Sequence, residues 1–225
     1  MRHAVVTGAS SGIGEAIVKR LLAEGWRVTG LSRRSVALDA PHFTSLSVDI
    51  SKPDRLIAAL QPLAPPQAVI HAAGMMAAAP LGQLDSDTGC ALWRLNVQAC
   101  EVLFNHFAPG MSSGGRFVAI GSRTSRGAAG RSQYVATKAA LVGTIRSWAA
   151  ELAPRGITAN VVAPGATETP MLTAPGRETS PAKCPPIGRL IAPGEVAGLV
   201  NFLLSDEAAA ITGQEIAICG GASLS

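Results

Sequence analysis

Residues 6–17, VTGASSGIGEAI, place three glycines and two adjacent serines directly before a run that reads as a helix. The β-prone segment 3–7 comes before the glycines, and segment 15–24 has apolar residues at helical spacing. Glycines at such a junction let the backbone adopt positive φ and approach a ligand closely. The following helix N-terminus offers free N–H groups and a partial positive charge, which suit a pyrophosphate. The stretch therefore favours a dinucleotide site over an ordinary tight connection between a strand and a helix.

The rest of the chain repeats this alternation of strand-like and helix-like segments. Alternation of this kind predicts an α/β fold of the doubly wound Rossmann type, with a seven-stranded parallel sheet and helices on both faces. We expect one domain, 1–225, in which the Pro-, Thr- and Gly-rich segment 167–192 forms a mobile substrate lid. The expected strands are 3–7, 26–31, 43–48, 67–71, 115–120, 157–162 and 215–219, and the expected helices are 15–24, 53–60, 87–107, 133–153 and 194–204.

Composition excludes several classes of function. The 225 residues are 48% hydrophobic and only 4% aromatic, with a formal net charge of +4, so base-stacking platforms and nucleic-acid binding are not expected. No apolar run reaches the roughly 18 residues of a membrane span, and the first strand leaves no room for a signal peptide, which predicts a cytoplasmic protein. The four cysteines have no spacing typical of zinc, so we expect reduced thiols and no metal.

The end of the second expected strand indicates which dinucleotide binds. An acidic residue at this place holds the ribose 2′-hydroxyl of NAD, whereas an arginine accommodates the 2′-phosphate of NADP. The sequence here is Ser32-Arg33-Arg34, with no acid. We therefore expect NADP(H), with Arg33 as the main partner of the phosphate and Ser32 assisting. A solvated surface pair of arginines, or a site for NAD(H), is the alternative.

Several further motifs follow the glycine stretch in a fixed order. They are TGASSGIG at 7–14 itself, Asp49-Ile50, HAAG at 71–74, Asn96, the set Ser122, Tyr134 and Lys138, and Pro164-Gly165. On these motifs the chain resembles the short-chain dehydrogenase/reductase family from about residue 4 to residue 221. The resemblance implies a hydride-transferring oxidoreductase that interconverts a ketone or aldehyde and an alcohol. It also implies a small-molecule carbonyl or alcohol substrate and a homotetramer or homodimer.

Tyr134 and Lys138 carry the predicted acid–base chemistry. They lie four residues apart in an expected helix and so share one face. A neighbouring ammonium stabilises a phenolate, which lets the only tyrosine of the chain exchange a proton with a substrate oxygen near neutral pH. Outside this constellation, such a pair would be read as an ordinary surface pair.

The resemblance assigns the remaining site residues. Ser122 would orient the substrate oxygen, with Ser125 as a weaker candidate, and Asn96 would hold a water linking Lys138 to solvent. Lys138 would also bind the nicotinamide ribose. The implied cofactor contacts are Gly8, Ser10, Ser11, Gly12, Ile13, Gly14, Ser32, Arg33, Asp49, Ile50, Ala72, Ala73, Gly74, Tyr134, Lys138, Pro164, Gly165, Thr167 and Thr169.

Two departures from the family pattern affect these expectations. His71 and Ala72 stand where the family usually has two asparagines, and we expect His71 to substitute structurally, with a catalytic role as the alternative. The chain is also short for the family, partly within the expected lid. A catalytically silent redox sensor or scaffold is the competing function. An epimerase or dehydratase would need a larger C-terminal substrate domain, for which this chain has no room.

Overall fold

A single parallel sheet of seven strands organises the computed structural model, which describes residues 1–173, 181 and 183–224. The strand order is β3-β2-β1-β4-β5-β6-β7. This confirms the predicted fold class. The strands are β1 (His3–Thr7), β2 (Arg27–Ser32), β3 (Phe43–Ser47), β4 (Ala68–His71), β5 (Arg116–Ile120), β6 (Thr158–Pro164) and β7 (Glu215–Ile218).

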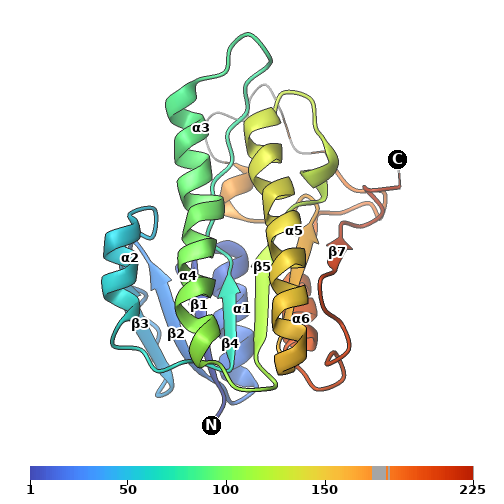
Figure 1. Ribbon diagram of the computed structural model, residues 1–225. Coiled ribbons are helices and arrows are strands. Elements are labelled where there is room, and N and C mark those ends of the chain that lie inside the picture. The colour runs from blue at the N-terminus through green and yellow to red at the C-terminus, as the bar shows by residue number, and fades with distance from the viewer. Residues whose placement is uncertain (174–180, 182, 225) are drawn as a thin grey trace.

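Helices cover both faces of the sheet. In Figure 1, α2, α4 and α5 lie in front of the strands, while α1 and α6 lie behind them. The α-helices are α1 (Gly12–Ala23), α2 (Pro53–Leu60), α3 (Ser86–Trp93), α4 (Ala99–Phe107), α5 (Ser132–Leu152) and α6 (Pro193–Leu203). A π-helical turn, η1 (Arg94–Gln98), joins α3 to α4, and the short 3₁₀ turns are η2 (Ala108–Gly110), η3 (Arg123–Arg126), η4 (Ala153–Arg155) and η5 (Pro170–Leu172).

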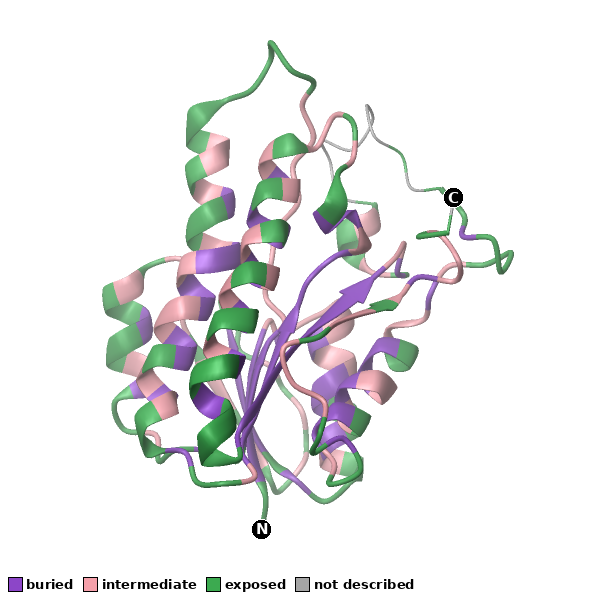
Figure 2. Ribbon diagram, turned by 45° about the vertical axis from the view of Figure 1, so that its right-hand side comes forward, coloured by how far each residue is buried: buried purple, intermediate pink, exposed green. Residues whose placement is uncertain are grey.

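Two apolar cores follow from the period-2 pattern of the strands. In β1, Val5 packs in the core under α2, α4 and α5, while Ala4 and Val6 pack against α1 and α6. Figure 2 shows the central strands as buried and the outer helix faces as exposed, whereas the residues of the edge strands β3 and β7 are intermediate or exposed. Among the described residues, no helix combines the length and the apolar character that crossing a bilayer requires.

Two helical expectations need correction. The first helix begins at Gly12, three residues before the expected start, because the Glu15 N–H already donates to the Ser11 carbonyl oxygen at 3.3 Å. The segment expected as one helix, 87–107, is divided by the π turn η1. One extra residue in a turn leaves the apolar periodicity on either side intact, so the pattern of the sequence did not indicate it.

Candidate functional site

A cavity of about 990 Å³ opens at the carboxyl edge of the sheet. It lies where the strand order reverses between β1 and β4, the position at which open α/β sheets bind ligands. Ends of β1, β2, β4, β5 and β6 and the first turns of α1 and α5 contribute to its wall. Most of the predicted site residues line this cavity; the exceptions are Gly14 and Asn96.

The glycine turn after β1 has the geometry expected of a phosphate cradle. Gly8 and Gly12 have φ of +73° and +58°, in the region that favours glycine. A Cβ on Gly14 would lie only 2.2 Å from the Gly8 carbonyl oxygen, so Gly14 closes the turn from behind rather than lining the cavity. Gly12 and Ile13 begin α1 and line the cavity, where the first N–H groups of a helix lack intrahelical partners.

A hydroxyl group ties β1 to β4 behind this turn. Thr7 Oγ1 accepts hydrogen bonds from the backbone N–H groups of Ala72 and Ala73, each at 3.1 Å, and lies 3.0 Å from His71 Nδ1. Because both lone pairs of the hydroxyl are used, its proton goes to Nδ1, and the ring carries its own proton on Nε2. Burial lowers the pKa of His71 to about 3, so the ring is neutral.

His71 therefore has the structural position expected of it. The side chain is fully buried and does not line the cavity, which argues against the catalytic alternative. The segment that follows His71 passes close to the glycine turn. A Cβ on Gly8 would lie 2.8 Å from the Ala73 nitrogen. The contact holds the two walls of the cofactor slot at a fixed separation.

The adenosine end of the cavity contains the predicted basic residue. Arg33 is exposed at the end of β2 and lines the cavity together with Asp49 and Ile50. Asp49 accepts hydrogen bonds from the hydroxyl and the N–H of Ser51, which lower its pKa. Ser32 also lines the cavity, but its hydroxyl donates to the Arg34 carbonyl at 2.7 Å. Its single proton is thus in use, which leaves Arg33 as the stronger donor to a phosphate.

Tyr134 and Lys138 face the other end of the cavity from the first turns of α5. Both are buried, and Lys138 Nζ lies 5.8 Å from the centre of the Tyr134 ring. The ammonium donates to the Ile120 carbonyl at 2.8 Å. Burial lowers the pKa of Lys138 from 10.5 to about 8, so the group is mainly charged at neutral pH. The predicted one-turn spacing does place both groups on the cavity side of one helix.

The structure separates the two serine candidates. Ser122 lines the cavity at the end of β5, and its Oγ lies 2.8 Å from Thr124 Oγ1. Ser125 is also buried but donates to the Glu215 carboxylate on β7 and does not line the cavity. The arrangement favours Ser122 and leaves Ser125 with a structural contact.

The water expected between Asn96 and Lys138 stays a prediction, whereas the contacts of the Asn96 side chain with the protein are defined. Asn96 is fully buried in the π turn η1, where its Oδ1 accepts from the Met75 N–H at 3.0 Å and its Nδ2 donates to the Met75 carbonyl at 3.1 Å. The same Nδ2 lies 3.0 Å from Thr137 Oγ1. These contacts fix the segment that follows Gly74. A Cβ on Gly74 would lie 3.6 Å from Lys138 Nζ. Asn96 thereby shapes the pocket around Lys138 through the backbone.

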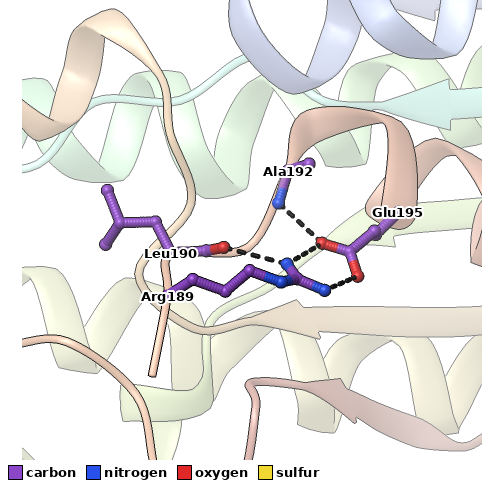
Figure 3. Close-up of polar contacts among 4 residues, drawn as sticks. All are labelled: Arg189, Leu190, Ala192 and Glu195. Atoms are coloured by element: carbon purple, nitrogen blue, oxygen red, sulfur yellow. Dashed lines mark hydrogen bonds and ion pairs between the residues drawn. The ribbon is translucent and has the colours of Figure 1, made fainter. Parts of the chain in front are cut away.

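The described ends of the expected lid are anchored. A parallel bridge joins Thr167 to Ile191, and the Thr169 side chain lies against the glycine turn, 3.1 Å from where a Cβ of Gly12 would be. Figure 3 shows Arg189 binding both carboxylate oxygens of Glu195, at 2.7 and 2.9 Å, at the start of α6. This ion pair lowers the pKa of Glu195 to about 2. Residues 174–180 and 182 lie outside the described residues, so the lid itself stays a prediction.

Several cavity residues escaped the sequence analysis. Those that extend the cofactor half are apolar and indistinguishable in sequence from core residues. Arg94 is basic and lies in the π turn η1, where no motif marks it. The missed residues include Leu31, Val48, Met75, Met76 and Arg94.

The residues present fit a dinucleotide. The glycine turn leaves room that any side chain would fill, and a basic residue stands at the adenosine end. At the opposite end a buried ammonium and a phenol converge beside Gly74. Among the described residues, no group of three His, Cys, Asp or Glu side chains could hold a metal ion.

Comparison with known proteins extends these observations to the whole chain. A family model described as "Enoyl-(Acyl carrier protein) reductase" matches residues 8–223. A carbonyl reductase family member 4 of Danio rerio is 36% identical, covering 99% of this chain and 98% of the relative. The 3-oxoacyl-[acyl-carrier-protein] reductase FabG of Vibrio cholerae is 32% identical, covering 97% and 96%.

Solved structures agree with the sequence relatives. A short chain dehydrogenase from Burkholderia cenocepacia, determined in complex with NADP, superposes with a TM-score of 0.86 at 32% identity. The match covers 98% of this chain and 97% of that one. A short chain dehydrogenase family protein from Francisella tularensis has a TM-score of 0.91 at 24% identity, covering all of both chains. That second likeness concerns the fold.

Proposed function

The chain belongs to the short-chain dehydrogenase/reductase family of oxidoreductases, and from this premise we propose an NADP(H)-dependent enzyme that interconverts a ketone or aldehyde and an alcohol. The observation that carries the proposal is the convergence of Tyr134 and Lys138 on the cavity that begins at the glycine turn. The relative from Burkholderia cenocepacia, solved with NADP, supports the choice of cofactor. A cytoplasmic location and assembly as a homotetramer or homodimer belong to the same proposal.

The chain's own groups perform the proton transfer. Bound NADPH supplies the hydride that the carbonyl carbon receives during reduction. The Tyr134 hydroxyl gives its proton to the carbonyl oxygen, and the Lys138 ammonium stabilises the phenolate left behind. Ser122 holds that oxygen in place: when Thr124 Oγ1 donates to Ser122 Oγ, the Ser122 proton is free for the substrate. In the oxidative direction, Tyr134 takes the proton from the alcohol.

The proposal is tested directly by following NADPH absorbance with a panel of ketones and aldehydes. Consumption of NADPH with formation of the matching alcohol supports it. Tight binding of NADPH without turnover of any carbonyl compound would instead indicate the redox sensor or scaffold considered from the sequence.

Substitution of Arg33 by aspartate should reverse the cofactor preference. The variant loses the guanidinium that faces the 2′-phosphate and gains a carboxylate that accepts from the ribose 2′-hydroxyl of NADH. We expect kcat/KM for NADPH to fall roughly 100-fold, since a charge-assisted hydrogen bond is lost and a like charge is added. The measurement is kcat/KM with both cofactors. A wild-type enzyme that already prefers NADH would contradict the assignment.

The two serines provide a matched pair within one loop. Ser122→Ala should lower kcat by roughly 10- to 100-fold, because the substrate oxygen loses one oriented donor. Ser125→Ala should leave kcat near that of wild type and lower thermal stability, because the hydroxyl binds Glu215 away from the cavity. Steady-state rates and melting curves of both variants check this. The opposite ranking of kcat would assign the role to Ser125.

A further inference from the structure

A second hollow, of about 560 Å³, opens beside the adenosine end of the cofactor cavity. We call it the α2 hollow, because one face of α2 forms one side of it and the ends of β2 and β3 form the other. Its lining residues are Arg33, Ser47, Val48, Asp49, Arg55, Ala58 and Ala59. Three of these, Arg33, Val48 and Asp49, also line the cofactor cavity, so the two spaces share a wall at the place assigned to the 2′-phosphate.

The helix α2 presents Arg55 to this hollow from a fixed position. Leu56 and Leu60 are fully buried in the core beneath α2, which sets the rotation of the helix. Arg55, Ala58 and Ala59 stand at i, i+3 and i+4 and therefore share another face. The methyl groups of the two alanines leave the space beside the Arg55 side chain open. Figure 1 shows α2 beside β3, at that edge of the sheet.

Two guanidinium groups are the side-chain donors that this wall has available. The Ser47 hydroxyl donates to the Arg33 carbonyl at 3.0 Å, so its single proton is in use. The Asp49 carboxylate is an acceptor and takes hydrogen bonds from the N–H and the hydroxyl of Ser51. Among the described residues, no carboxylate oxygen lies within ion-pair distance of Arg33 or Arg55. Both guanidinium groups can therefore bind a ligand.

The charge balance of the α2 hollow suits a phosphate better with both arginines than with one. Hydrogen bonds from Ser51 lower the pKa of Asp49, and the charges of Lys52 and Arg33 lower it further. Part of the Arg33 charge thus compensates the Asp49 carboxylate. A phosphate monoester carries between one and two negative charges near neutral pH, which is more than the remainder of one guanidinium can balance. Arg55 supplies the additional positive charge.

We infer that Arg55 is a second residue that selects NADP(H), and that its guanidinium binds the 2′-phosphate from the α2 side while Arg33 binds it from the end of β2. The inference rests on the proposed function and adds a residue to its cofactor site. A guanidinium group binds a phosphate through two parallel hydrogen bonds, so two such groups on separate elements would fix the position of the phosphate as well as attract it.

Calorimetric titration with 2′,5′-ADP and with 5′-AMP tests the inference without any turnover, because the two compounds differ only in the 2′-phosphate. Wild type should bind 2′,5′-ADP more tightly. Arg55→Gln should reduce this preference roughly tenfold, the lower range for a charge-assisted hydrogen bond, because the group is exposed. The affinity for 5′-AMP should stay at the wild-type value. The double variant Arg33→Gln/Arg55→Gln should bind both compounds almost equally.

Two further variants separate a specific contact from a general effect of charge. Arg34→Gln removes the same charge next to Arg33, but Arg34 is exposed and lines neither the cofactor cavity nor the α2 hollow. This matched control should retain the wild-type preference. Arg55→Lys keeps the charge but loses the paired hydrogen bonds, so its preference should lie between those of wild type and Arg55→Gln. Added salt should reduce the wild-type preference.

The outcomes distinguish this inference from the proposed function. If wild type prefers 2′,5′-ADP and Arg55→Gln keeps that preference, or if Arg34→Gln loses as much of it, the inference is overturned and the assignment to Arg33 stands. Equal binding of the two compounds by wild type would overturn both the inference and the choice of NADP(H). If the preference depends on Arg55 but no carbonyl compound is reduced, the inference holds and the proposed reductase fails.

Discussion

Replacement of Tyr134 by phenylalanine is expected to lower kcat by roughly 10²- to 10⁴-fold, the usual contribution of a positioned general acid. The ring is buried at the first turn of α5, and phenylalanine keeps its packing. Only the hydroxyl is lost, so no proton reaches the substrate oxygen as the hydride arrives. Binding of NADPH should change little, because the glycine turn and Arg33 are untouched.

The measurement is single-turnover reduction together with fluorescence titration of NADPH. A change in kcat without a change in the dissociation constant of NADPH separates proton transfer from cofactor binding. Full activity of this variant would refute the acid–base role. An equal loss of NADPH affinity and of kcat would show that Tyr134 contributes through packing and not through proton transfer.

Replacement of Lys138 by methionine should remove activity and also change how stability depends on pH. Methionine fills similar space without the ammonium that stabilises the phenolate, so we expect a loss of kcat of roughly 10²-fold or more, as for other proton-transfer groups. NADPH should also bind more weakly, because the amine is assigned to the nicotinamide ribose. Lys138→Arg serves as the control, since it keeps the charge but not the shape.

The direction of the stability effect follows from the pKa of Lys138. Burial lowers it from 10.5 to about 8, so the folded protein holds this proton less tightly than the unfolded chain. Wild-type stability therefore gains from this group as pH rises from about 8 to about 10.5, by roughly 3 kcal/mol over the full range. In Lys138→Met the gain is absent.

Denaturant unfolding of both proteins between pH 7 and pH 10 provides the check. The free energy of unfolding of wild type relative to the variant should rise with pH, and other titrating groups cancel in the difference. A constant difference would mean that Lys138 is as solvated in the folded state as in the unfolded one. The kcat/KM for reduction by wild type should fall above about pH 8 for the same reason.

The sequence predicted the parts of this molecule that depend on short-range pattern. Alternating apolar segments identified all seven strands, and the order of motifs around Gly12, Ser122 and Tyr134 identified most of the cavity. These features can be predicted from the sequence because each depends on neighbouring residues, or on the rule that parallel sheets bind ligands at their carboxyl edge.

The features that the sequence did not predict depend on contacts between segments that are distant in sequence. The single proton of the Ser32 hydroxyl goes to the Arg34 carbonyl, and Asn96 binds Met75 instead of lining the cavity. Arg94 lines the same cavity as Arg123 and Arg131 but comes from a separate element, so no spacing in the sequence could reveal that it lies there.

The π turn η1 affects the whole helical segment that α3, η1 and α4 form. One additional residue in a turn rotates everything beyond it by about 100° relative to an uninterrupted α-helix. The half before η1 can thus place Ala91 on the cavity wall while the half after it aims Leu103 and Phe107 at the protein interior. Deleting any one residue of 94–98 would restore ordinary winding and swing one half out of alignment, so this helical segment tolerates changes of side chain far better than changes of length.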